Sequence, residues 1–198
     1  MSLGPINVGR GAAAVVLVLL AAGCSLGGSS PPVHFYKVEP LAERNAGATS
    51  NTSVGVGPVL VPLYLDRAGL VTRKHEAEVG VSDEDRWAEP LDDMLATAIA
   101  ENLVRITGSD RIYAYPWPNA AHVDHRVFIR IVQFEIGTDG NAHLVCQWQV
   151  ESTGVAEPVV RRAELTVSPA SASPGPHVIA LSETIATLSR EIADVIKP

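Results

Sequence analysis

The chain has little basic charge and lacks the motifs of several enzyme classes. Its 15 Lys and Arg are outnumbered by 22 Asp and Glu, giving a formal net charge of −7 at pH 7. The absence of a basic run argues against binding to nucleic acid or polybasic attraction to anionic lipid. The G-x-S-x-G, H-E-x-x-H and G-x-x-x-x-G-K-[ST] motifs are also missing. We therefore expect a protein that is not an enzyme and carries no cofactor.

An apolar segment long enough to span a membrane is missing as well. The N-terminal apolar run, residues 12–22, is shorter than the about 20 residues that a spanning helix needs. It follows Arg10 and precedes the small residues before Cys24, a pattern typical of a secretory signal peptide. The end of the run resembles a bacterial lipobox, which implies a signal peptide over residues 1–23 and a lipid on Cys24. The alternative is an ordinary cleaved signal that contains a cysteine.

The chain after the signal divides into a tether and one domain. Residues 24–32, with Cys24 at their start, are rich in Gly, Ser and Pro and are expected to be flexible. Residues 33–198 are expected to form a single domain. Acyl chains on Cys24 would anchor it to a membrane without a spanning helix. Ser25, in place of an aspartate, favours the periplasmic face of the outer membrane under the usual enterobacterial sorting rule.

Cys146 would be the only free cysteine once Cys24 is acylated, so no intramolecular disulfide could form. It lies in an alternating apolar stretch, which favours a small core residue. A thiol nucleophile is the alternative, but no basic residue is beside it in the sequence.

Apolar periodicity predicts seven strands and two helices. Alternating or continuous apolar runs predict strands over residues 33–38, 54–65, 70–81, 111–115, 127–136, 143–151 and 159–167, and a 3.6-residue period predicts helices over 91–106 and 178–195. Pro58 and Pro62 predict a bend or bulge in the second strand, and residues 83–85 a solvated turn. Pro90 suits a first helical position and Gly108 a helix end. The fold class is therefore α/β: one mixed sheet with two helices packed on it, in the order β-β-β-α-β-β-β-β-α.

His122, Asp124 and His125 are the best candidates for metal ligands. A zinc site needs three or four converging ligands, and two histidines on a loop supply half of that at most. Solvated loop residues are the favoured interpretation, and no metal site is predicted.

Trp87 lies just before the proline that opens the first predicted helix. It could pack the helix entry against the sheet. It could instead be an exposed anchor at an interface, where Trp and Arg are favoured. On the residues alone, packing is the favoured interpretation.

A string around these residues resembles a known family. Four short stretches resemble the ABC-type transport auxiliary lipoproteins, which include the paraquat-inducible protein C lipoproteins. They are Tyr64-Leu65-Asp66-Arg67, Leu70-Val71-Thr72-Arg73, Arg86-Trp87-Ala88-Glu89-Pro90-Leu91 and Asn102-Leu103, which together we call the family string. The resemblance extends from Phe35 to the C-terminal helix.

The resemblance implies a non-enzymatic outer-membrane subunit of an envelope-spanning lipid transport system. Its expected partners are the membrane, an MCE-domain protein with associated permease or ABC components, and a second copy of the chain in a homo-oligomer. The partner-binding residues would be Tyr64, Leu65, Asp66, Arg67, Arg73, Arg86, Trp87, Glu89 and Pro90.

Three hypotheses remain open at this point: docking, lipid or small-molecule binding, and hydrolysis. An apolar pocket of several hundred cubic ångströms would favour binding. A buried Ser or Cys bonded to a histidine would favour hydrolysis. An exposed patch near Trp87 would favour docking. An ion pair, Asp66 with Arg86 or Arg67 with Glu89, could hold that patch in shape.

Overall fold

The computed structural model describes residues 31–117 and 122–197, which belong almost entirely to the compact unit Val33–Pro198. Its elements are β1 (His34–Tyr36), β2 (Val54–Leu60), β3 (Gly69–His75), β4 (Glu78–Trp87), α2 (Leu91–Thr107), β5 (Ile112–Ala114), β6 (His125–Ile136), β7 (Ala142–Ser152), β8 (Val159–Val167) and α3 (Pro174–Ile196). The predicted signal peptide and Cys24 lie outside the described residues. Among those residues, no helix is long and apolar enough to cross a membrane.

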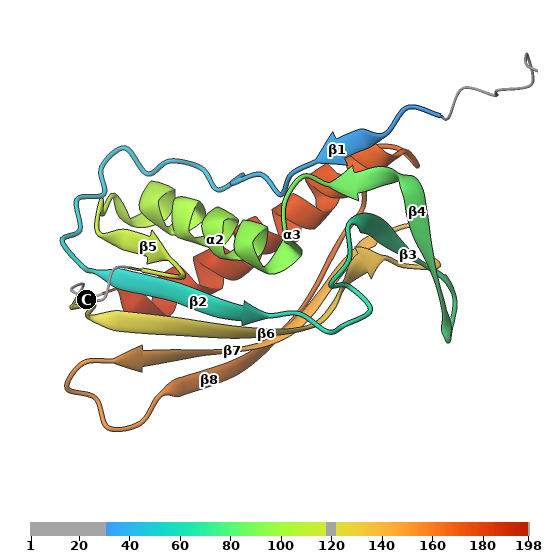
Figure 1. The fold of residues 1–198 in the computed structure, drawn as a ribbon. Helices are drawn as coiled ribbons and strands as arrows, with labels where there is room; N and C mark the ends of the chain where they lie inside the picture. The colour runs from blue at the N-terminus through green and yellow to red at the C-terminus, as the bar shows by residue number, and fades with distance from the viewer. Residues whose placement is uncertain (1–30, 118–121, 198) are drawn as a thin grey trace, which may run out of the picture. The chain divides into compact units, whose positions relative to one another are not determined.

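Strand β6 organises the sheet, because it pairs along both of its edges. One edge pairs antiparallel with β7, and β8 then pairs with β7. The other edge pairs parallel with β2 near its start and with β3 at its end. Strand β5 extends the sheet beyond β2, whereas β4 and then β1 extend it beyond β3 (Figure 1). The β3–β4 hairpin and β1 therefore form an arm that joins the sheet at the end of β6.

Helices α2 and α3 cover one face of this sheet (Figure 1). Helix α2 ends at Gly108, which has φ 70° and lies so close to the Ala48 carbonyl oxygen that a side chain there would collide with it. Helix α3 begins with Pro174, a residue suited to the first helical position. Asn102 of α2 also fixes the chain after β1, since its Oδ1 accepts a hydrogen bond from Ala42 N at 2.8 Å.

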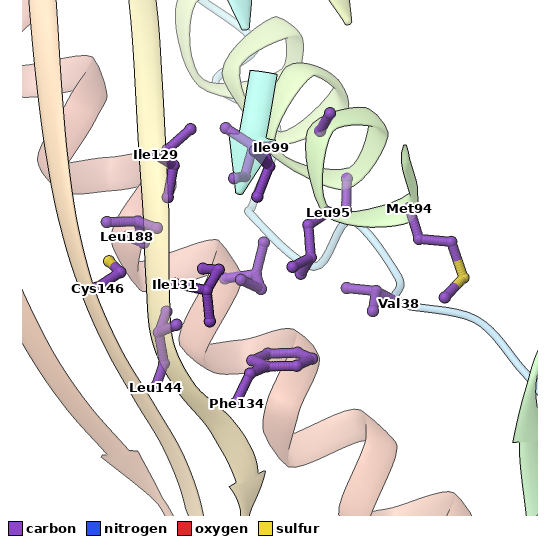
Figure 2. Packing of buried hydrophobic residues seen from close by; sticks show 14 of the residues in the cluster. Val38, Met94, Leu95, Ile99, Ile129, Ile131, Phe134, Leu144, Cys146 and Leu188 are labelled. Atoms are coloured by element: carbon purple, nitrogen blue, oxygen red, sulfur yellow. The ribbon is translucent and has the colours of Figure 1, made fainter. Parts of the chain in front are cut away.

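The core lies between the helices and the sheet. Figure 2 shows Leu95 and Ile99 of α2 facing Ile129 and Ile131 of β6. The fully buried side chains include Phe134, Leu95, Ile99, Leu144, Trp148 and Leu188. Cys146 joins them with no exposed surface, which confirms that it is a core residue. Burial raises the pKa of its thiol to about 12, so the thiol stays protonated and unreactive at neutral pH.

The predicted fold class is confirmed: a single mixed α/β sheet with two helices packed on it. A bulge between Val56 and Val59 confirms the irregularity expected at Pro58. Two local predictions were wrong. Residues 70–81 form two strands, β3 and the start of β4, instead of one. Residues 83–85 lie inside β4, because β3 and β1 pair with this strand and hold it extended.

Candidate functional site

Two parts of the family string, residues 64–67 and residues 86–91, meet at the base of the β3–β4 arm. The first part forms the turn after β2, and the second part leads from β4 into α2. Trp87 N donates a 2.7 Å hydrogen bond to the Ala68 carbonyl oxygen, and Gly69 pairs with Arg86. The structure therefore brings together segments that are about twenty residues apart in the chain, as element ends often do at binding sites.

Arg73 and Glu135 form a buried ion pair that joins β3 to β6. Arg73 Nε donates to Glu135 Oε1 at 2.6 Å, and a terminal guanidinium nitrogen of Arg73 contacts the same oxygen. The Glu135 side chain has no exposed surface, whereas that of Arg73 is 27% exposed. Gln133 Nε2 is a further donor to Oε1 at 3.3 Å. A buried carboxylate needs such partners, since an unpaired one is costly.

Tyr64 lies over the same pair. Its hydroxyl donates to the Val132 carbonyl oxygen at 3.3 Å. Burial, together with the negative charge of Glu135, raises the pKa of Tyr64 to about 12. The hydroxyl therefore stays protonated at neutral pH and serves as a hydrogen-bond donor. Tyr64 and Arg73 act here as structural residues, and their exposed neighbours present the surface.

Trp87 is buried, with 6% of its surface exposed, and its ring stacks on Phe134 at a centroid distance of 6.2 Å. The packing interpretation is therefore confirmed, and the exposed-anchor interpretation is wrong for this side chain. Leu65 is also buried, with 1% of its surface exposed. A partner at this site would contact the residues around Trp87 and Leu65.

We call the following exposed or partly exposed residues the docking surface: Asp66, Arg67, Arg86, Glu89 and Pro90 of the string, with Leu63 just before it. Arg86 is partly exposed, and its Nε donates to the Asp83 carbonyl oxygen at 2.9 Å. Leu63, which the sequence analysis missed, is 83% exposed. The predicted Asp66–Arg86 and Arg67–Glu89 ion pairs do not form in the described part of the chain, where Arg73 and Glu135 make the buried pair instead.

Two of the three candidate metal ligands, Asp124 and His125, have structural partners, whereas His122 is exposed. Asp124 Oδ2 accepts hydrogen bonds from Ser53 N and Ser53 Oγ, both at 2.8 Å, and these bonds lower the pKa of Asp124. His125 Nδ1 lies 2.7 Å from Ser152 Oγ. Within residues 31–117 and 122–197, no three His, Cys, Asp or Glu side chains gather in a way that could hold a metal ion.

Two histidines approach hydroxyl groups. Burial lowers the pKa of His125, so its imidazole is neutral at pH 7 beside Ser152. In the described part of the chain no carboxylate is hydrogen-bonded to this imidazole as a catalytic triad requires, and the neighbouring Asp124 carboxylate is bound to Ser53. His143 links Asp139 to Thr166, with contacts of 2.9 and 3.1 Å, on the exposed face of the sheet. Water there would weaken the electrostatic stabilisation of any charge that develops in a reaction.

An open apolar groove of about 700 Å³ is lined in part by β1, whose Phe35 pairs with Arg86 of the docking surface. It is bounded by β1, by the chain that follows β8 and by the start of α3. Its lining includes Phe35, Val167, Pro169, Pro176, Val178 and Ile179. This volume is in the range typical of small-molecule sites.

Comparison with known proteins gave one family and a set of similar folds. The family described as ABC-type transport auxiliary lipoprotein component matches residues 36–193. A crystal structure of an uncharacterized protein is 21% identical with a TM-score of 0.71, over 84% of this chain and 100% of that one. Protein XCC0632 from Xanthomonas campestris, of the family DUF330, is 14% identical with a TM-score of 0.68, over 81% and 93% of the two chains. These likenesses show the fold alone. No match was found among curated proteins.

Proposed function

The chain belongs to the ABC-type transport auxiliary lipoprotein family, and we propose that it docks the periplasmic component of an envelope-spanning MCE/ABC-type lipid transport system to the outer membrane. It does so as a non-enzymatic subunit held by a lipid on Cys24. Family membership is the observation that carries this proposal. The docking surface supports it, since polar residues of the family string are exposed there beside the apolar Leu63.

A rigid base under exposed side chains favours docking over a purely structural role. The Arg73–Glu135 pair and the Trp87–Phe134 stack fix the backbone on both sides of the docking surface. Exposed residues on a fixed backbone lose little conformational freedom when a partner binds, which favours affinity.

The anchor is tested by Cys24→Ser. This change removes the thiol that would carry the lipid, so the protein should lose fatty-acid labelling and appear in the soluble periplasmic fraction. Continued labelling and unchanged membrane fractionation would rule out Cys24 as the anchor.

The docking surface is tested by pull-down from solubilised envelopes with Arg67→Ala, Arg86→Ala and Glu89→Ala. Truncation of an interface residue of this kind should weaken association by about 2 kcal/mol. Arg162→Ala is the matched control, because Arg162 is exposed in β8, where it pairs with Glu164. The melting temperature of each variant separates lost binding from lost folding. Normal pull-down by all three variants would rule out this surface as the interface.

The non-enzymatic role is tested at the His125–Ser152 pair. Ser152→Ala should leave transport and partner binding unchanged, and the purified protein should show no turnover of esters, phosphodiesters or peptidoglycan fragments. Turnover that disappears in Ser152→Ala would establish a hydrolase instead.

A second candidate function, periplasmic binding of a lipid or small molecule, is favoured by the apolar groove between β1 and α3. Co-purification of a lipid with the soluble Cys24→Ser chain, and its loss in Ile179→Asp, would support this candidate.

A further inference from the structure

The apolar groove lies at the end of the molecule where the N-terminal chain enters the domain. Strand β1 lies beside the first turns of α3 (Figure 1), and Glu39 N donates to Ser182 Oγ at 3.0 Å just beyond the groove. We call the groove and the exposed side chains around it the anchor-side surface: Val33, Phe35, Val167, Pro169, Pro176 and Ile179. These residues come from three segments of the chain.

Large apolar side chains of this surface are exposed to solvent. Phe35 is 66% exposed, Ile179 is 47% exposed and Val33 is 42% exposed. A contiguous exposed apolar patch is a recognised sign of an interaction site, and Phe35 and Ile179 line the same groove. Val33 and Phe35 lie where the N-terminal chain enters the domain, and Phe35 pairs with Arg86 at the edge of the docking surface.

The segments of the anchor-side surface carry almost no charge. No Asp, Glu, Lys or Arg occurs in residues 165–182 or in residues 24–33, although 19% of the whole chain is charged. Lys37, Glu39 and Glu183 are the charged residues that line the groove, and Lys37 and Glu39 are exposed to water. A surface without charges loses little hydration when it enters a less polar medium, whereas each buried charge would oppose entry.

The proposed anchor limits how far this surface can be from the membrane. Cys24 precedes His34 by ten residues. Ten residues span at most about 35 Å when fully extended. Acylation of Cys24 would thus keep β1 within this distance of the bilayer. This confinement raises the effective concentration of lipid at β1.

We propose that the anchor-side surface binds the lipid bilayer that holds Cys24. Phe35 and Ile179 then lie at the level of the headgroups, and the ends of acyl chains enter the groove. The inference rests on the proposed lipid anchor. Apolar side chains at this depth give membrane affinity in proportion to the apolar area that they bury. The anchor alone would leave the domain free to rotate, whereas this contact gives it one orientation.

The orientation places the other end of the sheet away from the membrane. Val155, 61% exposed, lies in the turn between β7 and β8. Strand β8 separates this turn from the groove and spans roughly 27 Å over its length. Val155 is therefore an exposed apolar control position on the far side of the same sheet.

The test compares a fluorescent label at Ile179→Cys with one at Val155→Cys in the full acylated chain. Cys24 carries its lipid and Cys146 is buried, so the introduced thiol reacts alone. The chain is reconstituted into phosphatidylcholine vesicles with or without bromine on the acyl chains. Bromine should quench the label at 179 about threefold more than the label at 155, because it acts only at close range in the hydrocarbon.

A second change sharpens the comparison. Phe35→Glu places a charge on the surface and should reduce the quenching at 179 to the level at 155, with an unchanged melting temperature. The quenching at 179 should also persist at high salt, because the surface has few charges to be screened.

Equal quenching at 179 and 155 in a chain that is acylated and sediments with the vesicles would overturn the inference while leaving the docking proposal intact. Protection of the label at 179 from aqueous iodide, without quenching by bromine, would show a protein occupant and would also overturn it. Absence of acylation would instead remove the proposed anchor. Excess vesicles would then test the surface alone, and unequal quenching would still support it.

Discussion

The two hairpins of this sheet differ in how they are held. The β6–β7 hairpin pairs along nearly its whole length, from His125 with Ser152 to Ile136 with Ala142, and its inner face is covered by α3. The β3–β4 hairpin shows two register shifts, and β3 joins β6 through a single residue pair, Thr72 with Ile136. Backbone pairing is enough to hold the first hairpin, whereas the second depends on side chains that reach across to β6.

Two stretches of the family string lie on the second hairpin, Leu70–Arg73 in β3 and Arg86–Trp87 in β4. Arg73 and Trp87 contact Glu135 and Phe134, two consecutive residues near the end of β6. A segment held by few contacts opens at a lower free energy than the core. Substitutions at these contacts should therefore detach the β3–β4 arm and disturb the docking surface before they unfold the core.

Trp87→Ala should have the largest effect. It removes a buried ring that stacks on Phe134, and truncations of this kind cost about 4 kcal/mol. Urea unfolding measures the loss, and hydrogen exchange should show the β3–β4 amides opening first. Leu63→Ala, at an 83% exposed position on the neighbouring turn, is the control and should change stability little. Equal protection of both hairpins in Trp87→Ala would contradict the comparison.

Arg73→Ala should cost about 3 kcal/mol, because it leaves the Glu135 carboxylate buried without its cation. The control is Arg162→Ala, which breaks the exposed pair with Glu164 and should cost on the order of 0–1 kcal/mol. Thermal unfolding of the two variants measures the difference. Similar losses would show that Glu135 finds another partner when Arg73 is removed.

Gly69→Ala should cost about 2 kcal/mol through overpacking. A Cβ at Gly69 would collide with the Ser82 carbonyl oxygen and with Val81, which forces β3 and β4 apart. Gly175→Ala is the control, since nothing lies near its added methyl group. Partner pull-down on the folded fraction would show whether a separated hairpin still docks. A neutral Gly69→Ala would mean that the hairpin shifts freely.

Cys146→Ala tests the other hairpin and should cost on the order of 1 kcal/mol, as expected for a small buried side chain. The surrounding backbone pairs remain, so hydrogen exchange of β6 and β7 should change little. The native protein should react with a bulky thiol reagent only on global unfolding. Rapid labelling at neutral pH would show that β7 opens more easily than its pairing indicates.

The smallest effect is expected at Asp124, where β6 begins. Its pKa is lower in the folded chain than in the unfolded chain, because Ser53 donates hydrogen bonds to the carboxylate. The unfolded chain therefore takes up the proton first, and the contribution of Asp124 to stability is present near neutral pH and lost as the pH falls below about 4. Asp124→Asn should flatten the stability profile below about pH 4. An unchanged profile would assign the acid sensitivity to other carboxylates.

Regular elements could be predicted from the sequence because their signals are local. Strand β8 begins and ends where alternation places it, and α2 ends where Gly108 indicates. The β3–β4 turn was missed because Glu76 and Ala77 form it without a Gly, Pro or Asn, while Arg73 donates to the Glu76 carbonyl oxygen across it. Residues 83–85 were assigned to a turn because three consecutive acids are typical of one. Pairing with β1 and β3 overrides that preference.

The sequence predicted which residues belong to the candidate site but not which residues they contact. The resemblance located Arg73, Trp87 and their neighbours, yet their partners are on β6, about sixty residues away from Arg73. Glu135 had one signal, as the only acidic residue in β6. The register shift between Ile131 and Gln133 changes which side chains face inward after it, so alternation alone could not show that Glu135 is buried.

Strand β1 gives the molecule a defined mechanical path. Any pull on the N-terminal chain is first borne by three residue pairs, in which Phe35 lies opposite Arg86 and Tyr36 opposite Trp87. Beyond them, the hydrogen bonds from Glu39 to Ser182 and from Ala42 to Asn102 transfer the load to α3 and α2. Tension at the N-terminus therefore acts on the same residues that shape the docking surface before it reaches the helices.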